Sequence, residues 1–314
     1  MLFFLKNKLL IILCWIFLGL AASNIDLDLP RPLKSFVFVV DVTMSMNVKD
    51  KNLDNESVSR LEFTKKVLSD AMPGLTCGTN VGLGVFAGYQ TTILYDPIEV
   101  CENFSEILKS IENLNTGIIW AGDSEVSKGL FNALNLVQNI KRKSHVVFFT
   151  DGHEAPPISA KYRPRFDKKN GVESGIIIGV GGGNLVGIPR ISRSGERFGM
   201  WGADDVFQLD QFSLGRKGSD SAETLVDEPG VEIDPLLVET LQATPGKEHM
   251  SSLREKYLKL LADEHDLYYE NLDSKESLLR SLDNYRFASW RKFETNVSNF
   301  FALFAIFCLL MVFV

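Results

Sequence analysis

Five small side chains that carry oxygen atoms stand on three short segments of the chain, each beside an apolar run. They are Asp41, Thr43 and Ser45 on the first segment, Ser124 on the second and Asp151 on the third. Carboxylates and hydroxyls are ligands that hard cations prefer, and none of the five is a soft ligand that would favour zinc or copper. The residue types therefore predict a site for Mg²⁺ or Ca²⁺, if folding brings the three segments together.

The apolar runs beside these residues have the composition of buried parallel strands. Short segments rich in β-branched and aromatic residues, and apolar on both faces, occur at 35–41, 145–150 and 175–180. Apolar residues at helical spacing predict helices near 59–72 and 124–140. Strands that alternate with helices predict an α/β fold with a doubly wound, mostly parallel sheet and helices on both faces. Such sheets bind ligands beyond the C-terminal ends of their strands, where the oxygen-bearing side chains stand.

Two β-like runs on either side of Tyr89 predict one antiparallel edge strand in this sheet. In a hairpin centred on Tyr89, Ala87 pairs with Thr91, and the same register places Cys77 opposite Cys101. An exported compartment would permit a disulfide between these two cysteines. The alternative is that both thiols are small buried hydrophobic groups.

Both ends of the chain are apolar and indicate export to a membrane. Residues 1–23 place two lysines before an uncharged apolar run and then small residues, which is the order of a secretory signal peptide. An uncleaved membrane anchor is the alternative for this segment. A helix over the uncharged residues 297–314 spans about 27 Å, close to a hydrocarbon core of about 30 Å. We therefore expect a C-terminal transmembrane helix and a periplasmic domain anchored in the inner, cytoplasmic membrane.

The body of the chain has the features of one large domain. We expect it at 33–285, with a long insertion at about 181–246 that is rich in glycine, proline and charge. Ser252 and Glu255 have the spacing of a capping box and predict a helix directly after the insertion. A linker at 286–296 would join the domain to the C-terminal segment. The formal charge of −7 argues against a nucleic-acid partner, because phosphates attract a basic surface.

The three segments resemble the metal-ion-dependent adhesion site (MIDAS) of von Willebrand factor A (vWA) domains. That family carries Asp-x-Ser-x-Ser on the first loop, Thr on the second and Asp on the third, where this chain has DVTMS, GDS and TDG. The resemblance implies that Thr43, Ser45 and Ser124 bind the cation directly, whereas Asp41 and Asp151 act mainly through water. Thr43 and Ser124 differ from the family residues, but both keep the oxygen.

The second loop departs from the family pattern at one position and offers a rival at another. Asp123 stands where the family usually has glycine, and it adds a carboxylate near the rim of the site. Thr116 is the rival for the second-loop hydroxyl, but only Ser124 has the family's distance to Gly129-Leu130. A domain that keeps the three loops and binds no metal is the alternative to a competent site.

The resemblance to a more specific family extends along nearly the whole chain. DGHEAPP at 151–157, the glycine-rich 179–182 and the segments at 188–189 and 201–204 are similar to the MxaL-type family of bacterial methanol oxidation clusters. This implies an accessory protein in the maturation of the PQQ-dependent methanol dehydrogenase of the periplasm, particularly in calcium insertion. The implied partners are methanol dehydrogenase or other methanol-oxidation accessory proteins.

These features favour a binding module, and we do not expect an enzyme. Five ligand groups, mostly neutral hydroxyls, leave a divalent cation short of negative charge, so a partner's carboxylate would complete its coordination. Asp123, His153 and Glu154 are expected at the rim where that partner binds. A metal-dependent hydrolase would need His153 with Asp123 to activate water, but the site offers hydroxyls where hydrolases usually carry His and carboxylate ligands. An adhesion or envelope-assembly module unrelated to methanol oxidation is the other alternative.

Overall fold

The computed structural model describes residues 2–119, 121–158, 164–166, 175–192, 195–206, 223–225 and 247–312. The chain divides into two compact units. One unit is the domain Lys34–Phe287, and the other combines Met1–Leu33 with Ala288–Val314. All residues of the predicted cation site belong to the domain.

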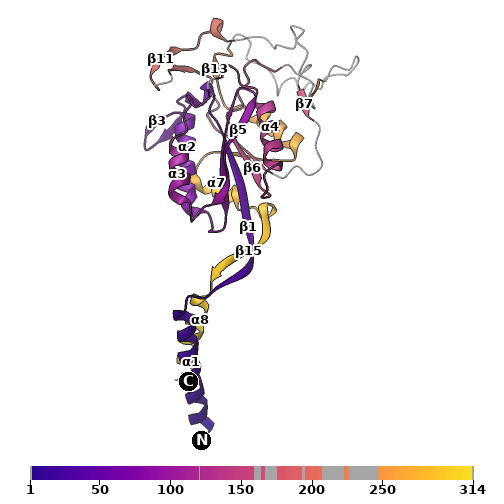
Figure 1. The fold of residues 1–314 in the computed structure, drawn as a ribbon. Helices are drawn as coiled ribbons and strands as arrows, with labels where there is room; N and C mark the ends of the chain where they lie inside the picture. The colour runs from indigo at the N-terminus through magenta and orange to yellow at the C-terminus, as the bar shows by residue number, and fades with distance from the viewer. Residues whose placement is uncertain are drawn as a thin grey trace. The chain divides into compact units, whose positions relative to one another are not determined.

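A mixed, mostly parallel sheet runs through the domain in the strand order β14-β8-β6-β1-β4-β5 (Figure 1). Its strands are β1 Asp26–Asp41, β4 Asn80–Ala87, β5 Gln90–Glu99, β6 His145–Thr150, β8 Ile176–Gly179 and β14 Tyr268–Asn271. Every neighbouring pair is parallel except β4 and β5, so β5 is the antiparallel edge strand. The predicted α/β fold with a mostly parallel sheet is confirmed.

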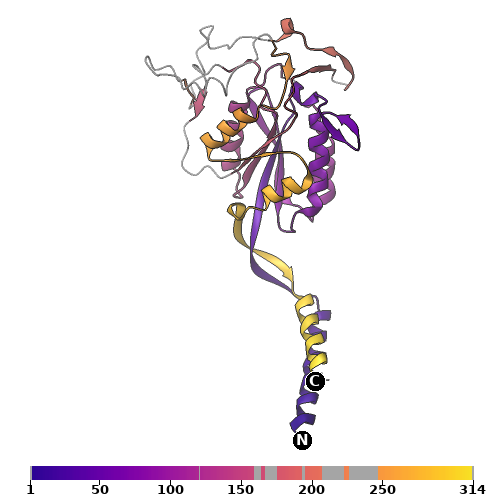
Figure 2. The same cartoon turned by 180° about the vertical axis from the view of Figure 1, so that it is seen from behind.

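Helices cover both faces of this sheet (Figures 1 and 2). They are α2 Arg60–Ala71, α3 Phe104–Glu112 and α7 Lys275–Leu282 on one face, and α4 Val126–Gln138 and α6 Glu255–His265 on the other. Alternate side chains of β1 enter the two cores: Phe36, Phe38 and Val40 pack with the first group, and Val37 and Val39 with the second. The central strand is therefore apolar on both faces, as its sequence predicts.

Helix α2 follows its local capping signals, whereas α6 does not. The hydroxyl of Ser59 accepts a hydrogen bond from the backbone N–H of Glu62, whose carboxylate accepts one from the N–H of Ser59. The helix ends at Ala71, where a short 3-10 turn begins. The capping box predicted for α6 is wrong, because Arg254 is the N-cap there and its side chain makes no capping bond.

Gly129 lies where α4 packs against the ring of Phe86, a fully buried side chain of β4. A Cβ atom at this position would overlap that ring. We expect Gly129→Ala to lower the free energy of unfolding by about 1–2 kcal/mol, because overpacking outweighs the gain in helix propensity. Urea unfolding followed by circular dichroism measures the change. Gly183→Ala, where the new Cβ meets open space, is the control. A more stable Gly129→Ala variant would contradict this packing argument.

The β4–β5 hairpin differs from its predicted register but contains the predicted disulfide. Ala87 pairs with Gln90 across a two-residue turn, so the expected pairing with Thr91 is wrong. Two irregularities further along the strands then shift the register. Cys77 and Cys101 are nevertheless bonded, with their Cα atoms 5.4 Å apart, and the alternative of two separate buried thiols is excluded.

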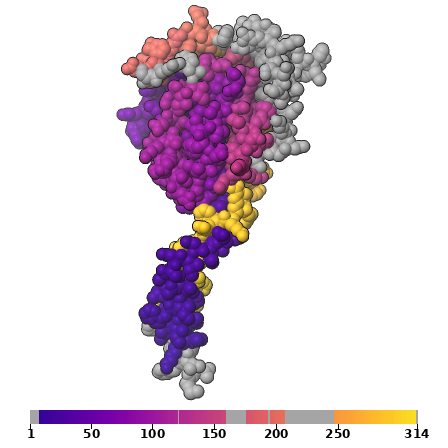
Figure 3. All heavy atoms as spheres, in the orientation of Figure 1, coloured from indigo at the N-terminus to yellow at the C-terminus, as the bar shows by residue number. Residues whose placement is uncertain are grey.

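The described part of the predicted insertion forms short strand pairs on the outer surface of the domain (salmon in Figure 3). β9 Val186–Gly187 pairs with β13 Met250–Ser251, β10 Pro189–Ile191 pairs with β11 Arg197–Met200, and a 3-10 turn covers Ala203–Asp205. Two further antiparallel pairs are β7 Pro164–Phe166 with β12 Glu223–Leu225, and β2 Lys51–Leu53 with β3 Glu56–Val58. Most of 207–246 lies outside the described residues.

The second unit contains both ends of the chain. Helices α1 (Leu2–Ala22) and α8 (Ser298–Val312) pack together through Phe17, whose ring stacks on Phe301 and Phe304. Strand β15 (Ala288–Asn296) pairs with β1. The segment that the sequence predicts as a linker is thus mostly strand, because its backbone groups pair with β1.

The terminal helices do not meet the expectation of a membrane-spanning segment. In the part of the chain that the structure describes, no helix combines the length and the apolar character that crossing a membrane requires. Helix α8 has 15 residues and reaches about 22 Å, against a hydrocarbon core of about 30 Å. The transmembrane helix predicted at 297–314 is therefore not supported. The signal peptide predicted at 1–23 is not supported either, since this segment is the helix α1 that packs on α8.

Candidate metal centre

The first loop places a carboxylate and two hydroxyls at the C-terminal end of β1. Oδ1 of Asp41 accepts hydrogen bonds from the backbone N–H and the hydroxyl of Thr43, at 2.9 and 2.7 Å. Its Oδ2 accepts one from the hydroxyl of Thr150 at 2.6 Å. The Oγ atom of Ser45 lies 3.2 Å from Oγ1 of Thr43. Because Thr43 gives its proton to Asp41, the lone pairs of its hydroxyl oxygen are available for a cation.

The third loop brings Asp151, at the C-terminal end of β6, to the same place. Its Oδ2 forms an ion pair with Arg60 and accepts a hydrogen bond from the hydroxyl of Ser251 at 2.9 Å. Its Oδ1 accepts the backbone N–H of His153 at 2.9 Å, and the side chain of Ser45 also hydrogen-bonds to this carboxylate. Asp41 and Asp151 thus hold the two hydroxyls of the first loop between them.

The second loop contributes Ser124, which short backbone bridges hold in place. Its N–H donates to the carbonyl of Ala155 at 2.7 Å, and the N–H of Ala155 returns the bond at 2.8 Å. The Oγ atom of Ser124 is buried and has no hydrogen-bond partner among the described residues. A buried hydroxyl without a partner is costly, which makes this oxygen a candidate to bind a cation or a water molecule.

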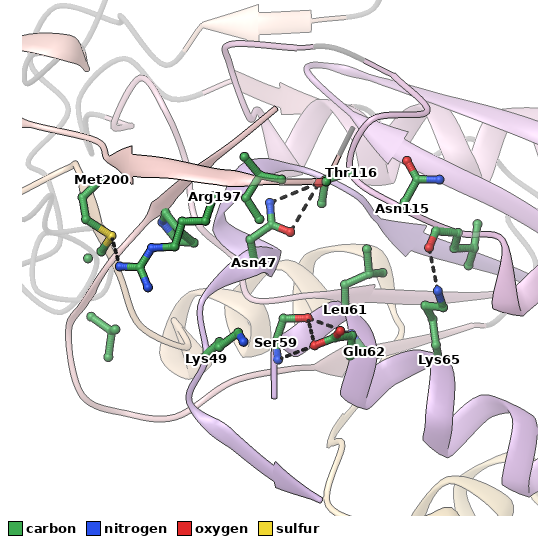
Figure 4. A pocket seen from close by; sticks show the side chains of 16 residues that line it. Asn47, Lys49, Ser59, Leu61, Glu62, Lys65, Asn115, Thr116, Arg197 and Met200 are labelled. Atoms are coloured by element: carbon green, nitrogen blue, oxygen red, sulfur yellow. Dashed lines mark hydrogen bonds between the residues drawn. The ribbon is translucent and has the colours of Figure 1, made fainter. Parts of the chain in front are cut away.

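Thr116, the other candidate for the second-loop hydroxyl, hydrogen-bonds outside the cavity. Its hydroxyl exchanges hydrogen bonds with the side-chain amide of Asn47, at 3.2 and 3.3 Å (Figure 4). It lines a separate pocket of about 430 Å³ between α2 and the insertion. Thr116 thus does not line the cavity that Ser124 lines, and the second-loop role of Ser124 stays a prediction.

The hydroxyls of the three loops line one small cavity of about 50 Å³. Its inner wall consists of Thr43, Met44, Ser45, Ala121, Gly122, Asp123, Ser124, His153 and Ala155. Its outer wall is made by side chains of the insertion and the segment that follows it: Ile188, Trp201, Asp205, Val206 and Glu248. A water molecule takes about 30 Å³ of liquid volume, so this space suits a cation with about one water.

The two carboxylates beneath the cavity differ in protonation. Burial, together with the negative charge of Asp151, raises the pKa of Asp41 to about 7. Burial alone would also raise the pKa of Asp151. The positive charge of the nearby Arg60 and the hydrogen bonds from His153 and Ser45 together outweigh this effect and hold the pKa of Asp151 below its ordinary value. A bound cation would favour the ionised form of both carboxylates.

The carboxylates are placed to act indirectly. Within the described residues, the only group of three or more His, Cys, Asp or Glu at metal-ligand spacing is Cys77, Glu99 and Cys101. Its two cysteines are joined in the disulfide and so cannot bind a metal. Asp41 and Asp151 instead hydrogen-bond to the hydroxyls of Thr43 and Ser45, and their water-mediated role stays a prediction.

The three predicted rim residues have different surroundings. Asp123 lines the cavity and is half-buried. His153 also lines it but is only 3% exposed. Glu154 is 1% exposed, and its Oε1 accepts bonds from the N–H of Ser127 at 3.1 Å and the hydroxyl of Tyr257 at 2.5 Å. The rim prediction for Glu154 is therefore wrong, because its side chain points into the core beside α4 and α6.

Arg60 is the main site residue that the sequence reasoning missed. Its guanidinium is fully buried and binds Asp50, Asp151 and the hydroxyl of Ser251. Helical periodicity could have indicated that Arg60 is buried, because it lies on the same face of α2 as the buried Thr64 and Val67. The contribution of Ser251 had no such signal, because it comes from β13 on the far side of the insertion.

Residues 36–153 match the family profile of the von Willebrand factor type A domain. The match covers 118 of the 314 residues and supports a vWA-like α/β fold for this segment. The chain's fold is similar to that of an aerotolerance-related membrane protein from Bacteroides fragilis, with a TM-score of 0.47 and 16% identity over 81% of this chain and 98% of that one. It is also similar to the PilB minor pilin of Streptococcus sanguinis, with a TM-score of 0.39 and 13% identity over 83% and 61% of the two chains. No curated protein matches the sequence.

The matched segment 36–153 contains all five predicted cation ligands. Asp123 and His153 also lie inside the matched residues, whereas the insertion and both terminal helices lie outside them. The cavity thus joins two parts of the chain. The vWA loops supply its inner wall, and the segments beyond residue 180 supply its outer wall.

Proposed function

We propose that the vWA domain binds a divalent cation, Mg²⁺ or Ca²⁺, in the cavity at the C-terminal ends of β1 and β6. Thr43, Ser45 and Ser124 would hold it through their hydroxyl oxygens, and Asp41 and Asp151 would supply negative charge through bound water. The observation that supports this most is that Ser124 lines the same cavity as Thr43 and Ser45, while its buried Oγ atom has no partner among the described residues. Bound at this position, the ion would act as a bridge to another carboxylate.

We further propose a binding role for this site rather than a catalytic one. Three neutral hydroxyls with two carboxylates, one of them paired to Arg60, leave a divalent cation short of negative charge. A carboxylate from a partner protein would complete the coordination. Residues of the insertion and the segment after it, such as Trp201 and Glu248, line the same cavity, so they would lie beside that partner.

Substitution of Ser124 tests the cation site with little risk to the fold, because its hydroxyl makes no hydrogen bond to any residue that the structure describes. We expect Ser124→Ala to weaken Mg²⁺ or Ca²⁺ binding by about tenfold or more in isothermal titration calorimetry. Ser127→Ala is the matched control, since its hydroxyl is also buried and unpartnered among the described residues but does not line the cavity. Equal affinity of the Ser124→Ala and native proteins would refute the proposed site.

For the partner, we propose methanol dehydrogenase or another methanol-oxidation accessory protein, in the periplasm. This rests on the similarity of DGHEAPP and its neighbouring segments to the MxaL-type family. The role would be maturation of the dehydrogenase, through calcium insertion. Large apolar side chains exposed on α1 and α8, such as Trp15 and Phe307, favour association with the membrane surface.

A deletion strain grown on methanol tests this role. An inactive dehydrogenase that high calcium restores would support maturation, and unaffected growth would refute it. An adhesion or envelope-assembly role is the alternative, and it would leave growth on methanol unchanged while the purified domain still binds the cation.

A further inference from the structure

His153 has a nitrogen atom for which the fold provides no partner. The residue follows Asp151 closely, is 3% exposed and lines the cation cavity with Ser45 and Ser124. Its Nδ1 is buried and makes no hydrogen bond to any described residue. His153 and Ser124 both line one cavity of about 50 Å³, and each side chain carries a buried atom, Nδ1 or Oγ, without a partner among the described residues.

The other side of the imidazole is fixed. The side chain of His153 hydrogen-bonds to the backbone of Glu248, and because Nδ1 has no partner, this bond is made by Nε2. An Nε2–H that donates to a carbonyl leaves the Nδ1 lone pair free. Histidines that bind metals typically donate their second nitrogen to a carbonyl or carboxylate in this way.

We infer that Nδ1 of His153 is a further ligand of the cation, in addition to the three hydroxyls. This inference rests on the proposed cation site and specifies its chemistry. Oxygen donors alone suit Mg²⁺ and Ca²⁺, whereas an imidazole nitrogen suits first-row transition ions. The site then binds Mn²⁺ more tightly than Mg²⁺, and it should discriminate against Ca²⁺, which prefers an all-oxygen shell.

Mn²⁺ is the probe that tests this ligand, because electron spin echo modulation detects nitrogen bound to it. We expect ¹⁴N modulation in the full-length protein loaded with Mn²⁺ and none in His153→Gln. Glutamine can keep the donor to Glu248 while it removes the nitrogen at the Nδ1 position. His249→Gln is the matched control, since its Nδ1 also has no partner among the described residues but does not line the cavity.

Affinities give a second measurement that is independent of the spectrum. We expect His153→Gln to weaken Mn²⁺ binding by about tenfold or more and Mg²⁺ binding by less than about threefold, so that the preference for Mn²⁺ is lost. Tight Mn²⁺ binding without ¹⁴N modulation, or with unchanged affinity in His153→Gln, would overturn the inference and leave the oxygen site intact. Failure of the native protein to bind any of the three cations would overturn both proposals.

Discussion

Replacement of Arg60 by methionine is expected to lower the free energy of unfolding by about 3–5 kcal/mol. The guanidinium is fully buried and pairs with Asp50 and Asp151, and it also donates to Ser251. Removal of the Arg60 guanidinium leaves the carboxylate of Asp151 buried beside Asp41 without its positively charged partner. The cost comes mainly from this uncompensated charge and not from the loss of packing, because methionine fills much of the same volume.

Urea unfolding of the full chain, without added metal, measures this effect. Lys66→Met is the control on the same helix, because the Lys66–Asp70 pair is exposed and should contribute less than about 1 kcal/mol. Adding Asp151→Asn to Arg60→Met should recover part of the loss, since it removes the unpaired charge. If the double variant is no more stable than Arg60→Met, uncompensated charge is not the cause.

Loss of the Cys77–Cys101 disulfide is expected to lower the free energy of unfolding by about 3 kcal/mol. The bond closes a loop between residues separated by 24 positions, and opening it restores the conformational entropy of that loop to the unfolded chain. The effect should appear in the Cys77→Ala/Cys101→Ala variant and in the reduced native protein.

The two free cysteines allow a clean control. Cys14 and Cys308 are unpaired and belong to the terminal unit, so reductant should leave the stability of the double alanine variant unchanged. A native protein that unfolds at the same urea concentration with and without reductant would show that the bond does not stabilise the domain.

The strands and the ligand loops were predictable because their signals are local. A buried parallel strand must be apolar on both faces, and 35–41 and 145–150 already show this in the sequence. The C-terminal ends of parallel strands meet at one edge of a sheet, so Asp41 and Asp151 had to approach each other once both strands formed. The spacing of Ser124 before its helix was sufficient to prefer it over Thr116.

In the β4–β5 hairpin, the disulfide was predicted correctly although the strand register used to predict it was wrong. The disulfide between Cys77 and Cys101 was predicted from a turn centred on Tyr89, but Ala87 pairs with Gln90. Irregularities within the strands shift the pairing along the hairpin. Such irregularities leave no clear mark in residue types, because they depend on how the two strands pack against the rest of the domain.

Residue types and their periodicity alone were enough to establish the α/β fold, the central strand and the oxygen-rich loops. The cavity depended on contacts between residues distant in the chain. Arg60, Ser251 and Trp201 reach the site from a helix and from two segments beyond residue 180. Burial also placed Glu154 in the core and left Nδ1 of His153 without a partner among the residues that the structure describes. Local patterns specify which face of an element is apolar, whereas the partner of a buried polar group is set by whatever the packed chain places beside it.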